Sequence, residues 1–237
     1  MNKKGTPLLK ALLFEHRLPW RYYIIKREFI KGTSNFFTLL TITPLLFLKG
    51  YRPIKKEHVK GNRFFVFINK KNKLVIKIPR KFGPVHSFAL KNPENFKKYS
   101  VCLTGLESHP SIQKHMCKVI KIFRSGGYIS SYIEGYNMQI LLNQLKDKEI
   151  TLKPELKRDI LKAIQEIIQS LEESKKEGKY PFGDWLIRNL IYDTRLGRII
   201  NVDLEGFYLH DKNVHALTSS IEKIKEELNE SIKILRD

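Results

Sequence analysis

The chain is poor in cysteine and in long apolar runs. Its 237 residues include only two cysteines, Cys102 and Cys117, too few for a disulfide framework or a cysteine-rich metal site. We expect both to be core thiols. The longest apolar stretch, residues 36–48, has 13 residues including Pro44, whereas a membrane-spanning helix needs roughly 20. No secretory signal is evident. We therefore expect a cytoplasmic protein, at most peripheral to the inner face of a membrane.

Acidic residues are also scarce. The chain has 24 Asp and Glu against 44 Lys and Arg, a net charge of +20, and residues 1–60 carry 13 basic and 3 acidic residues. This excess predicts a polyanionic partner: a phosphorylated ligand, an anionic membrane face or nucleic acid. Residues 1–54 form a basic, aromatic N-terminal extension. A basic amphipathic helix there would suit an anionic membrane surface, while packing on the following domain is the alternative.

The period-two pattern of β-forming residues begins near residue 55. The segments "RFFVFI" and "KLVIKI" predict a hairpin over 63–78. Asn92 and Pro93 predict the start of a helix that ends near residue 106. Two further strands are expected around the Gly-Gly turn at 126–127. Residues 55–130 are therefore expected to be a β-sheet with one helix.

The second half, residues 131–237, is mainly helical by pattern. After a loop at 134–135, a helix is expected from about residue 138. A longer one over 153–178 has a single apolar stripe that includes Ile160, Ile164 and Ile167. The stretch 190–200 predicts a hairpin, and 212–237 predicts a charged amphipathic helix. The whole is an α+β chain of two lobes, one β-rich and one short and helical.

Three oxygen-bearing side chains are brought together by this hairpin. Asp184 lies in the loop before it, Asn189 begins its first strand, and Asp203 follows its second strand. A hairpin places its two ends side by side, so these residues are expected to converge. Carboxylate and amide oxygens suit Mg²⁺ bound to nucleotide phosphates. An Asp without a metal ligand role can accept the proton of an attacking hydroxyl.

The pattern D-x-x-x-x-N at 184–189, followed by "DLEG" at Asp203, resembles the catalytic and metal-binding loops of the protein-kinase-like superfamily. Upstream, "LVIKI" resembles the strand that carries the kinase lysine, and "YISSYIEGYNM" resembles the hinge. The resemblance covers residues 55–210. It implies a two-lobed kinase-like fold, ATP and Mg²⁺ as cofactors, Asp184 as the catalytic base, and Asn189 with Asp203 as metal ligands.

The same resemblance implies a nucleotide site. Lys77 would pair with phosphates, Gly61 would lie in the phosphate-covering loop, and the backbone of Ser131 and Ile133 would meet the adenine. Glu94 is the candidate partner of Lys77. Its alternative role is to place a negative charge at a helix N-terminus.

The sequence departs from regulated protein kinases in several places. Phe182 stands where a His is usual, and no G-x-G-x-x-G loop is present. The motif "DLEGF" is similar to choline and aminoglycoside kinases, where Glu205 would be a further metal oxygen or an Arg-paired carboxylate. Only 34 residues follow Asp203. The chain therefore resembles minimal kinases, above all bacterial lipopolysaccharide core heptose and Kdo kinases.

This resemblance implies an ATP-dependent phosphotransferase that acts on a hydroxyl of a sugar or glycolipid. The expected partners are nucleotide and an anionic or sugar-containing acceptor, with peripheral contact to an anionic membrane. The alternatives are a pseudokinase or scaffold, and a small atypical protein kinase. A nucleic-acid-binding role is disfavoured because no motif of that kind is present and Asp184 and Asp203 would be unexplained. His109, His115, His210 and His215 have no metal-ligand spacing and are expected at the surface or as caps.

Overall fold

A computed structural model describes residues 42–53, 64–79, 93–106, 108–179, 184–204 and 214–236, without the side chains of 214–220. The strands are β1 Arg52–Pro53, β2 Phe64–Asn69, β3 Leu74–Pro79, β4 Val119–Ile122, β5 Tyr128–Ser131, β6 Gly135–Asn137, β7 Leu190–Asp193 and β8 Arg198–Asn201. The helices are α4 Pro93–Thr104, α5 Pro110–Gln113, α6 Met138–Lys146, α7 Pro154–Lys176, the 3₁₀ turn η2 Ile187–Asn189 and α8 Val214–Arg236. The chain is thus α+β, as predicted.

The larger sheet is antiparallel, with five strands in the order β1-β2-β3-β5-β4. The predicted hairpin over 63–78 is confirmed as β2 and β3, and the Gly-Gly turn joins β4 to β5. Within this sheet Lys77 lies opposite Val66 on one side and Tyr128 on the other. The predicted helix is α4, which starts at Pro93. Lys77 therefore lies on a central strand.

The smaller sheet has the order β6-β7-β8. The predicted hairpin over 190–200 is confirmed, whereas of the loop expected at 134–135 only Glu134 lies outside a strand and Gly135 begins β6. Gly135 allows this pairing, because a Cβ atom at that position would overlap the Tyr192 carbonyl oxygen. One boundary was wrong: Asn189 ends η2, and β7 begins one residue later.

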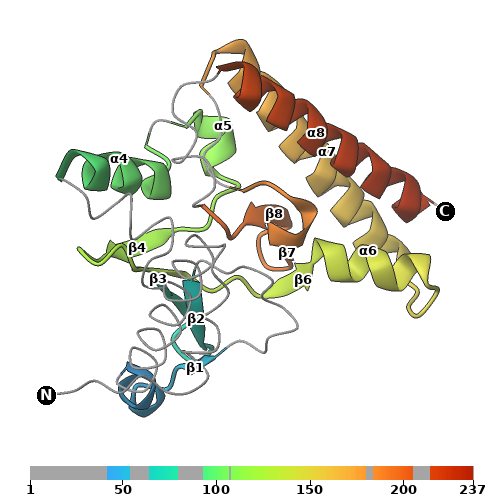
Figure 1. The fold of residues 1–237 in the computed structure, drawn as a ribbon. Helices are drawn as coiled ribbons and strands as arrows, with labels where there is room; N and C mark the ends of the chain where they lie inside the picture. The colour runs from blue at the N-terminus through green and yellow to red at the C-terminus, as the bar shows by residue number, and fades with distance from the viewer. Residues whose placement is uncertain are drawn as a thin grey trace, which may run out of the picture.

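The long helices α7 and α8 pack along each other, and α6 lies across one end of the pair (Figure 1). The apolar stripe predicted for α7 is confirmed, with Ile160, Ile164 and Ile167 fully buried. Residues of α8 such as Ile221 and Leu228 join the same core. The short helix α5, which the sequence analysis did not predict, also packs on α7.

A second core cluster joins the two halves of the fold. It combines Tyr99 of α4, Tyr128 of β5, Ile200 of β8 and Leu204 just beyond β8. Both cysteines are buried in this cluster, as predicted, and they form no disulfide. In Figure 1, the larger sheet and α4 lie on one side, α6, α7 and α8 on the other, and the smaller sheet between them. The end of β8 is thus held close to β3.

Part of the predicted N-terminal extension belongs to the larger sheet. Residues 42–48 are helical and β1 follows them. Leu46 and Tyr51 are buried against Phe67 and Ile76 of the hairpin. For this part of the extension, packing on the following domain is therefore correct. Residues 1–41, with the amphipathic helix expected there, lie outside the described residues.

Candidate functional site

The Lys77 amine points from β3 toward the segment that follows β8. Its Nζ donates to the Val202 carbonyl oxygen at 3.0 Å and lies 3.4 Å from Asp203 Oδ1. It also lies 5.5 Å from the centre of the Tyr128 ring, a cation–π distance. Only 12% of the Lys77 side chain is exposed. A nearly buried ammonium needs compensating charge, and the Asp203 carboxylate supplies it.

The two aspartates are joined through their main chains. The Asp184 N–H donates to the Asp203 carbonyl oxygen at 2.7 Å. Their side chains are 30% and 31% exposed, so solvent or a ligand reaches both carboxylates. The predicted proximity of Asp184 and Asp203 is therefore confirmed, with main-chain atoms joining the loops and both side chains partly exposed.

Asn189 explains the gap of five residues between it and Asp184. Its N–H closes η2 on the Leu186 carbonyl at 2.8 Å. This turn brings its Nδ2 to the Asp184 carbonyl at 3.0 Å, and its own carbonyl accepts from the Val202 N–H at 3.0 Å. Since Nδ2 is already engaged as a donor, Oδ1 is the side-chain atom that remains to face a cation.

These residues fit a Mg²⁺ ion of the kind that arrives with nucleotide. Asp203 provides a carboxylate and Asn189 an amide oxygen, both hard ligands, and Mg²⁺ takes its other ligands from phosphates and water. The part of the chain that the structure describes contains no group of three or more His, Cys, Asp or Glu side chains suited to a metal. The fit thus relies on one carboxylate and one amide.

Asn201 is a site residue that the sequence reasoning missed. Its Oδ1 accepts from the Asp203 N–H at 2.9 Å, an arrangement in which an Asn side chain holds the backbone two residues later. Its own N–H donates to the His115 carbonyl, and its carbonyl accepts from the Cys117 N–H. The Asn two residues before Asp203 in "NVD" was the available signal.

His115 corrects the expectation of a surface or capping histidine. The side chain is fully buried. Its Nδ1 lies 2.8 Å from the Ile199 carbonyl oxygen, and its Nε2 lies 3.3 Å from Ser170 Oγ. Burial lowers the pKa of His115, partly offset by the bond to Ile199. His115 is therefore a neutral link between β8 and α7. His109 is a helix cap as expected, accepting from the Ser111 N–H.

The two residues predicted to meet adenine lie at and just past the end of β5. The Ser131 N–H donates to the Lys118 carbonyl at 2.9 Å, so a Ser131 contact to adenine would have to use its carbonyl oxygen. Ile133 is 9% exposed and belongs to the cluster that contains Tyr128 and Leu204. Their role in binding nucleotide stays a prediction.

Glu94 pairs with Lys98 and not with Lys77, the partner that the resemblance implied. Its carboxylate pairs with Lys98 one turn along α4 at 3.6 Å, and its side chain is 77% exposed. The position in the first turn of α4 matches the alternative role, a negative charge at a helix N-terminus. Gly61, Phe182 and Glu205 lie outside the described residues, and so does the phosphate-covering loop expected around Gly61.

No helix among residues 42–53, 64–79, 93–106, 108–179, 184–204 and 214–236 combines the length and apolarity needed to cross a bilayer. Comparison with protein-family models gives no match. No curated protein matches the sequence either.

Proposed function

We propose that the chain is an ATP-dependent phosphotransferase with a two-lobed, kinase-like arrangement, and that its acceptor is a hydroxyl of a sugar or glycolipid. One observation carries the proposal. Lys77 on β3, Asp184 and Asn189 before β7, and Asp203 after β8 are joined by direct contacts into one cluster. An ammonium, an amide and two accessible carboxylates are the groups that phosphoryl transfer needs for charge and position.

Each residue has a distinct role in this reaction. Asp184 orients the acceptor hydroxyl and takes its proton as the oxygen bonds to phosphorus and ADP leaves. Lys77 places its positive charge beside the phosphates. Asn189 and Asp203 would hold a magnesium ion, which when bound would neutralise charge on the transferred group. The protein mainly supplies position and electrostatics.

The test is release of ADP from Mg-ATP in the presence of glycan and glycolipid acceptors. Asp184→Asn and Asp203→Asn keep the side-chain shape. Asp184→Asn is expected to lower turnover by roughly 10²–10⁴-fold, the usual contribution of a general base. Asp203→Asn removes the charge of a metal ligand and is also expected to lower turnover. Asp147→Asn, at the exposed end of α6, is the control and is expected to leave turnover unchanged.

Full turnover in both Asp184→Asn and Asp203→Asn would contradict the assignment. Binding of ATP without transfer to any acceptor would favour the scaffold alternative. Transfer to protein hydroxyls but not to glycans would favour a small atypical protein kinase. Contact of the basic N-terminal segment with anionic membranes remains a prediction, testable by co-sedimentation with anionic and neutral vesicles.

A further inference from the structure

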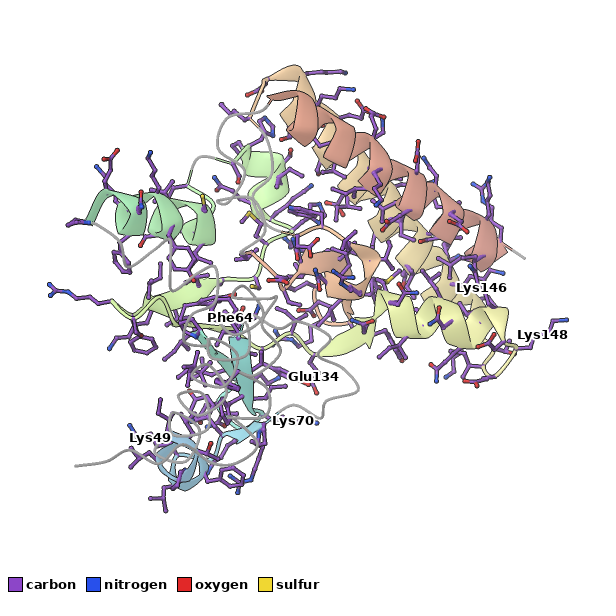
Figure 2. The ribbon with its side chains drawn as sticks, in the orientation of Figure 1. Lys49, Phe64, Lys70, Glu134, Lys146 and Lys148 are labelled. Atoms are coloured by element: carbon purple, nitrogen blue, oxygen red, sulfur yellow. The ribbon has the colours of Figure 1, made fainter. Side chains whose placement is uncertain are left out.

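A pocket of about 220 Å³ lies where α6, η2 and α8 meet. Its wall includes Leu186, Ile187 and Arg188, which begin two residues after Asp184 in the chain. Lys146, on α6, also lines it and is labelled in Figure 2. The nucleotide-side residues Lys77 and Asp203 are not among the lining residues. Asp184 is not among them either, so the pocket is a separate space whose wall begins at Leu186, two residues after the expected catalytic base.

Arg188 connects this pocket to Asp184. It lines the pocket, and its guanidinium lies 3.5 Å from Asp184 Oδ2. The Arg188 carbonyl accepts from Asn137 Nδ2 at 2.8 Å, which fixes η2 on the start of α6. Arg188 is therefore the residue that links the two: Asp184 does not line the pocket itself, and a ligand would reach its carboxylate past the Arg188 guanidinium.

The lining mixes polar groups with apolar ones. Amides come from Gln139 and Asn143, carboxylates from Glu227 and Glu230, and an apolar surface from Leu142 and Ile234. Sugar rings present hydroxyls at their edges and C–H groups on their faces. A pocket with donors, acceptors and an apolar surface is complementary to such a ring.

Several polar atoms of the lining have capacity left for a ligand. Gln139 Nε2 donates to Asn143 Oδ1 at 3.0 Å, which leaves the Asn143 amide as a donor and the Gln139 carbonyl as an acceptor. Glu227 Oε2 accepts from the Ile187 N–H at 3.5 Å. A carboxylate can accept further hydrogen bonds at its other oxygen. Glu227 therefore suits a ligand hydroxyl.

Charge and size narrow the ligand class. The lining holds two cations, Lys146 and Arg188, and two carboxylates, Glu227 and Glu230, and Lys146 pairs with Glu230 at 3.8 Å. This balance favours a neutral ligand over a phosphate or a polycation. The volume, about 220 Å³, is below the roughly 300–1,000 Å³ of pockets for drug-sized ligands. One sugar ring is the matching size.

We propose that this pocket binds one neutral sugar ring of the acceptor and presents a hydroxyl of that ring to Asp184. The proposal rests on the proposed function for the role as acceptor site, whereas binding of the sugar can be measured without nucleotide. The two ideas are therefore separable by experiment.

The test uses the full chain with methyl hexopyranosides and a methyl heptopyranoside as probes. Saturation-transfer NMR without nucleotide measures binding, and ADP release measures the KM for each sugar. Glu227→Gln and Asn143→Leu are expected to weaken binding and raise the sugar KM about tenfold or more, as for a lost hydrogen bond to ligand. The KM for ATP is expected to stay unchanged.

Two controls match these variants. Glu226→Gln changes an exposed carboxylate one residue away on α8, and Gln169→Leu removes an exposed amide that makes an equivalent bond one turn along α7. Both are expected to bind sugar normally. Thermal unfolding of all four variants checks that the fold is intact, and Asn143→Gln provides a milder change at the same position.

The outcomes separate the two proposals. Weaker sugar binding in Glu227→Gln and Asn143→Leu alone supports the pocket. Asp184-dependent transfer with a sugar KM unaffected by both variants overturns the pocket and leaves the phosphotransferase standing. Sugar binding lost in both variants, with no transfer to any acceptor, upholds the sugar pocket and refutes the proposed function.

Discussion

The two ends of the β7–β8 hairpin use the same residue type in opposite ways. At the turn, Asp193 is fully buried, and its Oδ1 accepts from the N–H groups of Arg195 and Leu196 at 2.8 and 3.1 Å. At the open end, Asp203 is held by its main chain, while its carboxylate is 31% exposed and lies near Lys77.

The difference separates a carboxylate that closes a turn from one whose oxygens are left accessible. The oxygen of Asp193 is used by turn amides, so it closes the loop and has little left for a ligand. The backbone of Asp203 is fixed by Asn201 and Asp184, which leaves its carboxylate oxygens to face Lys77 and solvent. The role of each carboxylate depends on whether backbone N–H groups bond to its oxygens, and burial alone does not decide it.

Among the tests of this comparison, we expect replacement of Lys77 at the open end to give the largest change in activity. Lys77→Met removes the charge that faces Asp203 and is expected to lower kcat/KM for ATP by roughly 100-fold or more, as for loss of a preorganised charge. Steady-state kinetics with varied ATP measures this. Lys71→Met, in the exposed β2–β3 turn, is the matched control. If kcat/KM of Lys77→Met for ATP stays within a factor of three of the wild-type value, the open end of the hairpin takes no part in the reaction.

Asn201 tests whether the open end depends on its backbone anchor. Asn201→Ala deletes the acceptor for the Asp203 N–H and is expected to lower turnover about tenfold, because one hydrogen bond is lost. Asn201→Ser restores an acceptor, more weakly, and should recover part of the activity. The rescue is the decisive comparison, since a purely packing role would be served no better by Ser than by Ala.

At the turn end the expected effect is on stability alone. Asp193→Ala removes two hydrogen bonds and is expected to lower the free energy of unfolding by about 1–2 kcal/mol. The loss is limited because Asp193 Oδ2 is buried without a hydrogen-bond partner among the described residues. Urea unfolding measures it, with Asp147→Ala as control. Turnover per folded molecule should be unchanged, and a large drop would show that both ends of the hairpin serve the reaction.

His115, which holds the middle of the hairpin through Ile199, should give the smallest effect. Burial lowers its pKa in the folded state, so the unfolded chain binds the proton more readily below the ordinary pKa of about 6.5. Stability is therefore complete above that value and falls as the pH drops below it. Urea unfolding from pH 7.5 to 5.5 should show a smaller decline in His115→Gln than in the wild type. Parallel curves would contradict this role.

Much of this contrast could be predicted from local sequence. The two strands of each predicted hairpin are rich in β-forming residues, and α7 repeats apolar residues at helical spacing. The hairpins and α7 could therefore be predicted from the sequence pattern. The meeting of Asp184, Asn189 and Asp203 followed from hairpin geometry. The meeting with Lys77 was suggested by resemblance, and the contact to Asp203 required the structure.

Other features depend on tertiary contacts that local patterns do not carry. β6 has turn-forming residues, Gly135 and Asn137, at both ends and is a strand because β7 pairs with it. His115 is buried because β8 and α7 enclose it, which nothing in "KHM" indicates. The pocket is formed by α6, η2 and α8, which are far apart in the sequence and meet in the fold. Arg188 links it to Asp184. Such features come from packing between segments.

The main-chain bond between Asp184 and Asp203 also makes these positions suitable for spectroscopic reporters. A cysteine at either position would keep the N–H or carbonyl that joins the loops, so a label there would leave the frame in place. The native thiols, Cys102 and Cys117, are 7% and 4% exposed and would react slowly with a polar labelling reagent. A probe at 184 or 203 would then report movements of these two loops directly, in single molecules as well as in bulk.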